Sequence, residues 1–290
     1  MTADRPIVAA VLGGVSWNTM VYVDIFPTPR PQTVFASRSR RTVGSSGAGK
    51  ALNLADLGVD TRLWALLGDD EEGRLVREAL DGAGIRFVPQ LDPAGTMRHV
   101  NLMDKTGERI SIFEQTGTLD AKPDPGPIRP LLEGADLVAI TILEHCRPLL
   151  GLVAEAGLGR WIDIHDYDGE NPYHEDFIDA ATHLFVSTVD LPGWRTFAEG
   201  RIAAGTEVVV CTHGVDGASG ITEAQGWIDI DAIPVDSVVD SNGAGDAFFA
   251  GFAVSWLASG DLGLALDAGA EQASHAVRSP DLAPIRGTDR

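Results

Sequence analysis

The chain has 290 residues, 44% of them hydrophobic, and a formal net charge of −20. This length and apolar content predict one large folded domain and exclude a disordered chain. The negative charge argues against nucleic acid or an anionic membrane surface as the main partner, although a phosphate ligand can still bind through local backbone donors.

Two cysteines are present, Cys146 and Cys211, and neither belongs to a CxxC or metal-type spacing. Both lie in apolar, strand-like runs, so we expect buried, reduced packing residues in a cytoplasmic protein. No apolar run is long enough to span a membrane, and residues 7–15 are more typical of a first strand than of a signal peptide.

Strand-like apolar runs alternate with helical patterns along the chain. In chain order we expect a strand at residues 7–12, a helix at 49–57, a strand at 62–67, a helix at 73–83, a strand at 137–142, a helix at 147–156, strands at 161–164 and 184–186, a helix at 191–203, strands at 208–211 and 220–223, and helices at 247–259 and 262–277. This order predicts an α/β fold in which helices cover both faces of a mostly parallel sheet. Such sheets bind ligands at the carboxyl ends of their strands.

Two segments interrupt the alternation. Residues 21–43 are rich in Pro and Arg and have β-like patches without a helix signal. Residues 99–103 and 109–113 are β-like runs on either side of Asp-Lys-Thr-Gly, which predicts a hairpin. Together these pieces predict a small separate sheet. The Pro-rich residues 121–130 are expected to form a linker.

The most informative run is DSNGAGDAFFAGF, residues 240–252. Its small residues allow backbone N–H groups to approach a ligand closely, and a helix that begins here would direct its dipole at an anion. Asp246 would then lie beside a bound phosphate and an incoming hydroxyl group. These are the parts needed to deprotonate an alcohol and transfer a phosphoryl group to it.

This run resembles the C-terminal signature of the pfkB, or ribokinase-like, carbohydrate kinases, with Ser241 in place of the usual Thr. The resemblance implies a single ribokinase-like three-layer domain over residues 1–290, with a β lid from about residues 16–43 and 96–114 that often mediates homodimers. It implies ATP-dependent phosphorylation of a hydroxymethyl group of a sugar or sugar-like molecule. Asp246 would be the catalytic base, and the backbone of Gly243, Ala244 and Gly245 would form the anion hole.

The substrate positions of the family differ in this chain. Asn18 stands where sugar kinases of this type have an Asp that grips substrate hydroxyls; a simple turn residue is an equal interpretation. The family's Gly-Gly-x-x-Ala-Asn loop is similar to residues 44–49, which places Gly47 in a small-residue cradle and Gly49 at the Asn that contacts sugar. Glu144, after a strand, matches a substrate-contacting Glu, although a solvated loop acid also fits.

The nucleotide positions follow from the same resemblance. Thr212, Gly214 and Gly217 match the family's ATP loop, and Asn242 and His275 are placed beside the nucleotide; a turn and a packing residue are the competing interpretations. Asp190 matches a Glu tied to Mg²⁺, which needs few direct protein ligands. Asp240 matches a position that helps to hold a monovalent cation such as K⁺.

Asp163, His165, Asp166, Asp168, His174, Glu175 and Asp176 crowd one region. A metal site there is less expected than a solvated loop, because no metal-type helix spacing is present, but Asp163 or His165 could reach a substrate.

Three alternative functions remain from the sequence. One is a nucleoside kinase on the same scaffold, and the second is a ligand-binding or regulatory homologue whose catalysis is impaired. The third, a dinucleotide-dependent oxidoreductase, is disfavoured because residues 13–16 do not form a GxGxxG turn.

Overall fold

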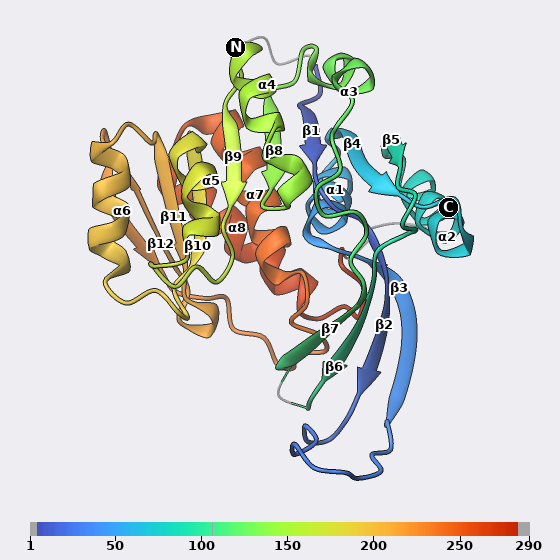
Figure 1. Cartoon of the computed structure of the whole chain (residues 1–290). Helices are drawn as coiled ribbons and strands as arrows, with labels where there is room; N and C mark the ends of the chain where they lie inside the picture. The colour runs from blue at the N-terminus through green and yellow to red at the C-terminus, as the bar shows by residue number, and fades with distance from the viewer. Residues whose placement is uncertain (1–4, 106, 284–290) are drawn as a thin grey trace.

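The computed structural model describes residues 5–105 and 107–283. A sheet of nine strands forms the centre of the molecule (Figure 1), in the order β13-β12-β11-β10-β9-β8-β1-β4-β5. Its strands are β1 (Val8–Leu12), β4 (Asp60–Leu67), β5 (Arg86–Leu91), β8 (Leu137–Thr141), β9 (Arg160–Asp163), β10 (His183–Ser187), β11 (Val208–Thr212), β12 (Ala218–Thr222) and β13 (Gly226–Ile230). All neighbours from β5 to β11 are parallel, whereas β12 and β13 pair antiparallel at one edge.

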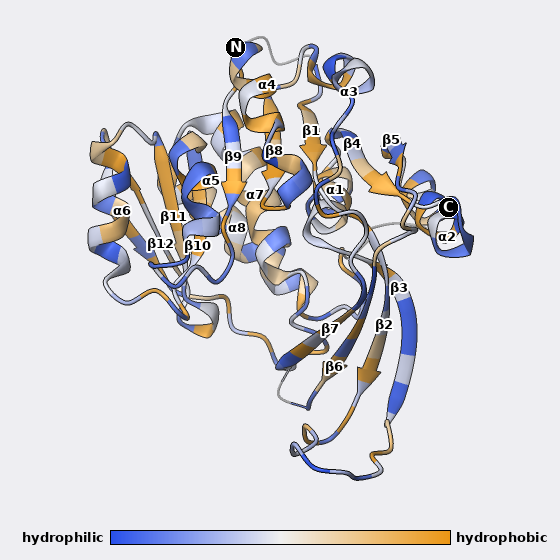
Figure 2. Ribbon diagram, viewed as in Figure 1, coloured by the Kyte–Doolittle hydropathy of each residue, from blue (hydrophilic) through white to orange (hydrophobic). Residues whose placement is uncertain are grey.

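Helices cover both faces of this sheet, so the predicted three-layer arrangement is present. One hydrophobic core lies under α1 (Ser46–Asp56), α2 (Glu71–Gly82), α7 (Ala244–Ser259) and α8 (Leu262–Ala276). The other lies under α3 (Pro125–Leu132), α4 (Leu149–Glu155), α5 (Glu175–Ala180) and α6 (Trp194–Ala203). Because both faces are covered, β1 is apolar throughout, and β8 and β11 are apolar up to a final threonine, as the orange strands in Figure 2 show.

Local sequence signals explain where several helices begin. The Asp70 side chain accepts a hydrogen bond from the Gly73 amide at the start of α2, and Asp261 accepts one from Leu264 at the start of α8. α7 has apolar residues on all sides because it packs between the sheet, α1 and α8. Asp246 is the acidic residue in its first turn, within an otherwise apolar helix.

A second sheet of four strands projects from the carboxyl edge of the large one (Figure 1). We call it the small sheet; it contains β2 (Ser16–Tyr22), β3 (Arg38–Gly44), β6 (Arg98–Met103) and β7 (Arg109–Gln115) in the order β3-β2-β6-β7. Its strands come from the two segments that interrupt the sequence alternation. β6 and β7 form the expected antiparallel hairpin.

Some boundaries and elements differ from the sequence expectation. Residues 121–130 were expected to be a linker, but α3 begins at Pro125, with the Asp124 side chain capping it by accepting from the Gly126 amide. α7 begins at Ala244 rather than at residue 247. The sequence patterns also did not predict β5, β13 or α5. Within the described part of the chain, no helix combines the length and the apolarity that a membrane span requires.

Candidate active site

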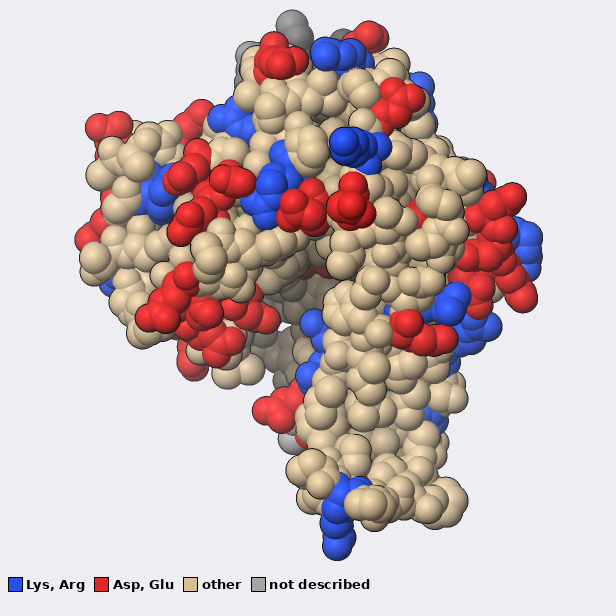
Figure 3. Space-filling model, in the orientation of Figure 1, with Lys and Arg blue, Asp and Glu red and all other residues tan. Residues whose placement is uncertain are grey.

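The predicted site lies where the parallel strands end, in a recess that separates the core from the small sheet (Figure 3). Asp163 is the last residue of β9, and Thr212 is the last residue of β11. Helices α1 and α7 begin at the same edge and contact each other there through their first turns. The fold therefore brings residues from distant parts of the chain to one place.

Asp246 lies in the first turn of α7 and is 9% exposed. Its Oδ1 accepts hydrogen bonds from Ser46 Oγ at 2.8 Å and from Lys50 Nζ at 2.6 Å. Its Oδ2 lies against Gly49, where a Cβ atom would come within 2.1 Å of that oxygen. One carboxylate oxygen is thus held by α1, and the second has no hydrogen-bond partner within the described residues.

The close approach of the Asp246 carboxylate explains why position 49 is a glycine. The resemblance places a sugar-binding Asn at this position, and an Asn side chain here would occupy the space that the Asp246 carboxylate fills. Gly47 is required for a different reason, since a Cβ atom there would lie 2.4 Å from the Gly14 carbonyl oxygen. Both glycines therefore allow α1 to pack closely, one against α7 and the other against the segment after β1.

Strained backbone marks the same region. Ser45, just before α1, has φ 74°, and His165, just after β9, has φ 52°; they are the two non-glycine residues with positive φ within residues 5–105 and 107–283. Ser45 has ψ 152°, a conformation that is almost confined to glycine. Such conformations persist where the surrounding structure holds them, and they are concentrated at functional sites.

The turn before α7 has the form of an anion site. Gly243 has φ 87°, and the amides of Gly245 and Asp246 lie in the first helical turn, where no intrahelical acceptor exists. Apart from its chain neighbours and the backbone of α7 itself, no heavy atom of the described residues lies within 4 Å of the place where a Cβ of Gly245 would be, so there is open space beside this turn. A phosphoryl group fits such a space, because the donors and the helix dipole both favour an anion.

Residues 240–242 connect this turn to the small sheet. Asp240 is 2% exposed; its Oδ2 accepts from the Tyr22 hydroxyl at 2.7 Å, and its Oδ1 accepts from the Asn242 amide at 2.8 Å. The Asn242 side chain accepts a hydrogen bond from Arg109 on β7, and Ser241 Oγ donates to the Gly107 carbonyl in the hairpin turn. The Asn242 side chain therefore contacts the small sheet.

The predicted nucleotide loop follows β11. Gly214 has φ 61° and Gly217 has φ 100°, and a Cβ atom on Gly217 would meet the Ile230 carbonyl oxygen at 2.0 Å. The two ring nitrogens of His213 are hydrogen-bonded, Nδ1 to Thr188 Oγ1 and Nε2 to Ser219 Oγ, both at 2.8 Å. An open pocket of about 280 Å³ lies beside the loop, and its lining residues are Trp194, Arg195, His213, Asp216, Ala218, Ser219, Asp229, Ile230 and Asp231.

Two predicted substrate residues differ in placement. Asn18 is buried on β2, and its Oδ1 accepts from Ser16 Oγ at 2.8 Å. Glu144 lies after β8 in an exposed ion pair with Arg147 at 3.0 Å. Among the described residues, no hydrogen bond or ion pair links the Glu144 or the Asn18 side chain directly to Asp246.

A family model described as pfkB family carbohydrate kinase matches residues 173–285. The chain is 32% identical over 278 residues to the acarbose 7(IV)-phosphotransferase of Actinoplanes sp., a match that covers 93% of this chain and 92% of that protein. The chain belongs to the pfkB family of carbohydrate kinases.

Further relatives agree with this family. The ATP-dependent ribose-1-phosphate kinase of Halopiger xanaduensis is 29% identical, over 88% of this kinase and 86% of that protein. A microbiome-derived acarbose kinase superposes with a TM-score of 0.85 at 33% identity, covering 93% of each chain. The Arabidopsis thaliana ribokinase, solved with ribose and ATP, has a TM-score of 0.79 at 22% identity over 96% of this chain and 95% of that one. The predicted family and the ribokinase-like fold are confirmed.

Two predicted residues of the kinase lie at its surface. Asp190 is exposed in the turn after β10, and His275 is near the end of α8, with its Nε2 3.8 Å from Glu271. No group of three or more metal-type side chains occurs in the described ranges, which includes the acidic cluster at 163–176. The acidic side chains of that cluster from Asp166 to Asp176 are exposed, whereas Asp163 is buried and accepts a hydrogen bond from Lys50 at 2.9 Å.

Sequence reasoning missed several buried polar residues of the kinase. Lys50 is not among the residues predicted for the site, yet its ammonium group donates hydrogen bonds to both Asp163 and Asp246. His99 and Asn101 are buried on β6 and each has a side-chain atom without a partner among the described residues; burial lowers the pKa of His99 to about 4. By register they share the face of the small sheet that carries Asn18. The alternation of side chains between the two faces of β6 could have indicated that His99 and Asn101 lie on the same face.

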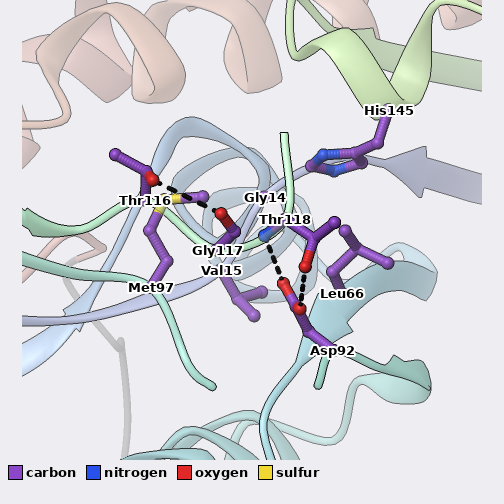
Figure 4. A pocket seen from close by; sticks show the side chains of 9 residues that line it. All are labelled: Gly14, Val15, Leu66, Asp92, Met97, Thr116, Gly117, Thr118 and His145. Atoms are coloured by element: carbon purple, nitrogen blue, oxygen red, sulfur yellow. Dashed lines mark hydrogen bonds between the residues drawn. The ribbon is translucent and has the colours of Figure 1, made fainter. Parts of the chain in front are cut away.

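A small cavity adjoins this region, between the segment after β1 and the residues that follow β7 (Figure 4). Its volume is about 10 Å³, enough for one water molecule. The Asp92 carboxylate accepts from the amide and the hydroxyl of Thr118 on one side, and the buried His145 ring lies on the other. Burial lowers the pKa of His145 to about 4, so this imidazole is neutral.

Proposed function

We propose that this kinase transfers the γ-phosphoryl group of ATP to a hydroxymethyl group of a sugar or sugar-like molecule, with Asp246 as the base. The observation that supports it most is the Asp246 carboxylate, which has one oxygen held by Ser46 and Lys50 and lies beside the open space at Gly245. A base and an anion site side by side are what this reaction requires.

Each step can be assigned to residues of the chain. Asp246 Oδ2 accepts the proton of the substrate hydroxyl as that oxygen bonds to the γ-phosphorus, while the bond from phosphorus to the ADP oxygen breaks. The amides of Gly245 and Asp246, with Gly243 and Ala244 shaping the turn, hold the charge on the phosphoryl oxygens. Thr212, Gly214 and Gly217 would hold the nucleotide, with Asn242 and His275 beside it. Asn18, Gly47 and Glu144 are the proposed substrate residues.

Metal ions would act through few direct contacts. Mg²⁺, when bound, neutralises phosphate charge, and it retains several waters in proteins, which suits the single exposed carboxylate of Asp190. A monovalent cation such as K⁺ would have to share Asp240 with the Tyr22 hydroxyl and with Arg40, whose guanidinium nitrogen is 3.9 Å away. Activity measured in K⁺ against tetramethylammonium would test that second ion.

The acceptor is proposed from the relatives. Acarbose is the first compound to assay, because an acarbose phosphotransferase and an acarbose kinase are each more than 30% identical to this chain. Ribose 1-phosphate and ribose follow from the other names. A nucleoside kinase is the second candidate, since the nucleoside kinase of Methanothermobacter thermautotrophicus is 28% identical over 90% of this chain. Release of ADP with each acceptor separates these possibilities.

The test of the base is Asp246→Asn. We expect turnover to fall by roughly 10³-fold or more, because removal of a general base typically costs 10²–10⁴ and its charge is lost too. ATP affinity, measured by calorimetry, should be nearly unchanged. Asp267→Asn on the exposed side of α8 is the matched control. Wild-type turnover in the Asp246 variant would refute the role, and no ADP release by the wild type with any acceptor would favour an impaired, ligand-binding homologue.

We also propose that the small sheet acts as a lid and forms a homodimer. One of its faces carries Tyr22, Arg40 and Arg109, which contact residues 240–242 before α7. By register, the opposite face carries Val21, Val100, Leu102, Ile110 and Ile112, of which the two isoleucines are exposed. An apolar sheet face of this kind favours a protein partner. Light scattering should show a dimer that Ile112→Lys converts to a monomer; a monomeric wild type would refute the proposed dimer.

We also propose a cytoplasmic location, based on the two free cysteines.

A further inference from the structure

Lys50 is a buried cation that the predicted chemistry does not use. It lies in the second turn of α1, its exposed fraction is 2%, and it is among the largest fully buried side chains. Burial of an unpaired ammonium group is very costly, so a lysine in such a place needs partners that compensate its charge. Those partners indicate what the residue does.

The ammonium group of Lys50 has three N–H donors and three acceptors. It donates to Asp246 Oδ1 at 2.6 Å, to Asp163 Oδ2 at 2.9 Å and to Ser46 Oγ at 2.8 Å. The Phe249 ring of α7 lies 5.1 Å from the nitrogen atom. All donors of the ammonium group are therefore used, and its position is fixed from three elements: α1, β9 and α7.

The charges around Lys50 are unequal. Two carboxylates, Asp163 and Asp246, face one ammonium group. Within residues 5–105 and 107–283, the further titratable group in contact with them is His165, whose Nδ1 is 3.5 Å from Asp163 Oδ2. Burial by itself lowers the pKa of Lys50, but the two carboxylates outweigh it and raise the pKa above its usual value. Burial by itself raises the pKa of Asp163, but Lys50, His165 and their hydrogen bonds lower it to about 2. Lys50 and Asp163 are therefore both ionised.

We infer that Lys50 and Asp163 are positioning residues for the catalytic base: Lys50 fixes the Asp246 carboxylate so that Oδ2 faces the substrate hydroxyl, and Asp163 keeps Lys50 in place when Asp246 has taken the proton. This inference rests on the proposed role of Asp246. Gly49 and Lys50 act as a consecutive pair, because Gly49 makes room for Oδ2 while Lys50 holds Oδ1.

The second carboxylate is needed because the charge of Asp246 changes during turnover. Before the reaction Lys50 is paired with two carboxylates, and after proton transfer Asp246 is neutral. Without Asp163, that step would leave a buried ammonium group without a counterion, which opposes the transfer. With Asp163 present, the ammonium group remains paired on both sides of the step, and its position is the same for the next cycle.

The inference predicts a particular pH dependence. If Lys50 is removed, two buried carboxylates lie close together without a cation, which raises the pKa of one of them. The base must be ionised to act, so activity is lost as pH falls through its pKa. The acid limb of kcat/KM against pH should therefore move to higher pH, by roughly one unit or more, in Lys50→Met. A residue that only supports the fold would not move this limb.

The experiment measures ADP release from acarbose phosphorylation between pH 5 and 9 (or with whichever acceptor the wild type uses), together with thermal melting, for Lys50→Met, Asp163→Asn and the double variant. In Lys50→Met, kcat should fall about 10²-fold because the base is misplaced, with the acid limb shifted as above. In the double variant the limb should return toward the wild-type position while kcat stays low. Lys122→Met, an exposed lysine before α3, is the matched control.

Each outcome decides the matter. If Lys50→Met does not fold, the double variant is compared with Asp163→Asn, because the double variant removes one positive and one negative charge together. A kcat about 10²-fold lower in the double variant than in Asp163→Asn supports the inference. An unmoved acid limb in folded Lys50→Met, or equal kcat in the double variant and Asp163→Asn, overturns it while wild-type activity leaves the proposed function intact. An inactive wild type overturns both.

Discussion

Replacement of Gly49 by alanine tests the geometry of the site with a single methyl group. The added Cβ would lie 2.1 Å from Asp246 Oδ2 and 2.8 Å from its Cγ. An ordinary contact needs about 3.5 Å, so the carboxylate oxygen must move by more than about 1 Å. That movement cannot be made without disturbing the hydrogen bonds from Ser46 and Lys50 to Oδ1. A misplacement of about 1 Å at the reacting groups costs on the order of 10²-fold, so kcat should fall by about that factor.

The assay is ADP release at saturating ATP and acceptor, with thermal melting to monitor the fold. Gly200→Ala is the matched control, because Gly200 also lies inside a helix, α6, and no atom lies within 4 Å of its added Cβ. That control should gain about 0.5–1 kcal/mol of stability and retain full activity. If Gly49→Ala folds and turns over at the wild-type rate, the Asp246 carboxylate does not act from the position described, and the argument for Gly49 fails.

Two further predictions concern stability. Gly217→Ala places a Cβ 2.0 Å from the Ile230 carbonyl oxygen at φ 100°, so it should lower the free energy of unfolding, measured in urea, by about 3 kcal/mol or more. The control Gly226→Ala, at φ 68° with open space around the added Cβ, should lower it by about 1 kcal/mol. Equal losses in the two variants would contradict the predicted clash at Gly217. Burial lowers the pKa of His183 to about 3. Below about pH 6.5 the unfolded chain therefore binds a proton at this histidine that the folded chain does not bind. The free energy of unfolding should fall from pH 6.5 toward pH 3, by up to about 1.4 kcal/mol per pH unit. His183→Phe, with its ring still stacked on Trp161, should flatten this slope; an unchanged slope would assign it to other groups.

The sequence predicted the large sheet well, because its central strands are buried on both faces and read as continuous apolar runs. β5 and β13 escaped prediction because they are edge strands with mixed, partly exposed side chains. α3 was hidden by its prolines, although Asp124 followed by Pro125 is a helix-start signal.

In the site, the 240–246 run was recognisable because its chemistry is contiguous in sequence. The pairing of Lys50 with Asp163 and Asp246 was not, since 113 and 196 residues separate the partners and only the fold brings them together. The change at Gly49 could be noticed from the sequence, but its cause, the space taken by a carboxylate from α7, required three-dimensional contacts.

The hydrogen bonds that join residues 240–242 to the small sheet have a mechanical consequence. Tyr22, Gly107 and Arg109 each contact one residue of that segment. The small sheet cannot swing outward without breaking these bonds or dragging the loop that leads into α7. Under the proposed function, an outward movement of the small sheet would therefore also displace the turn that is proposed to hold the phosphoryl group, so closure of the lid and assembly of the site would be coupled.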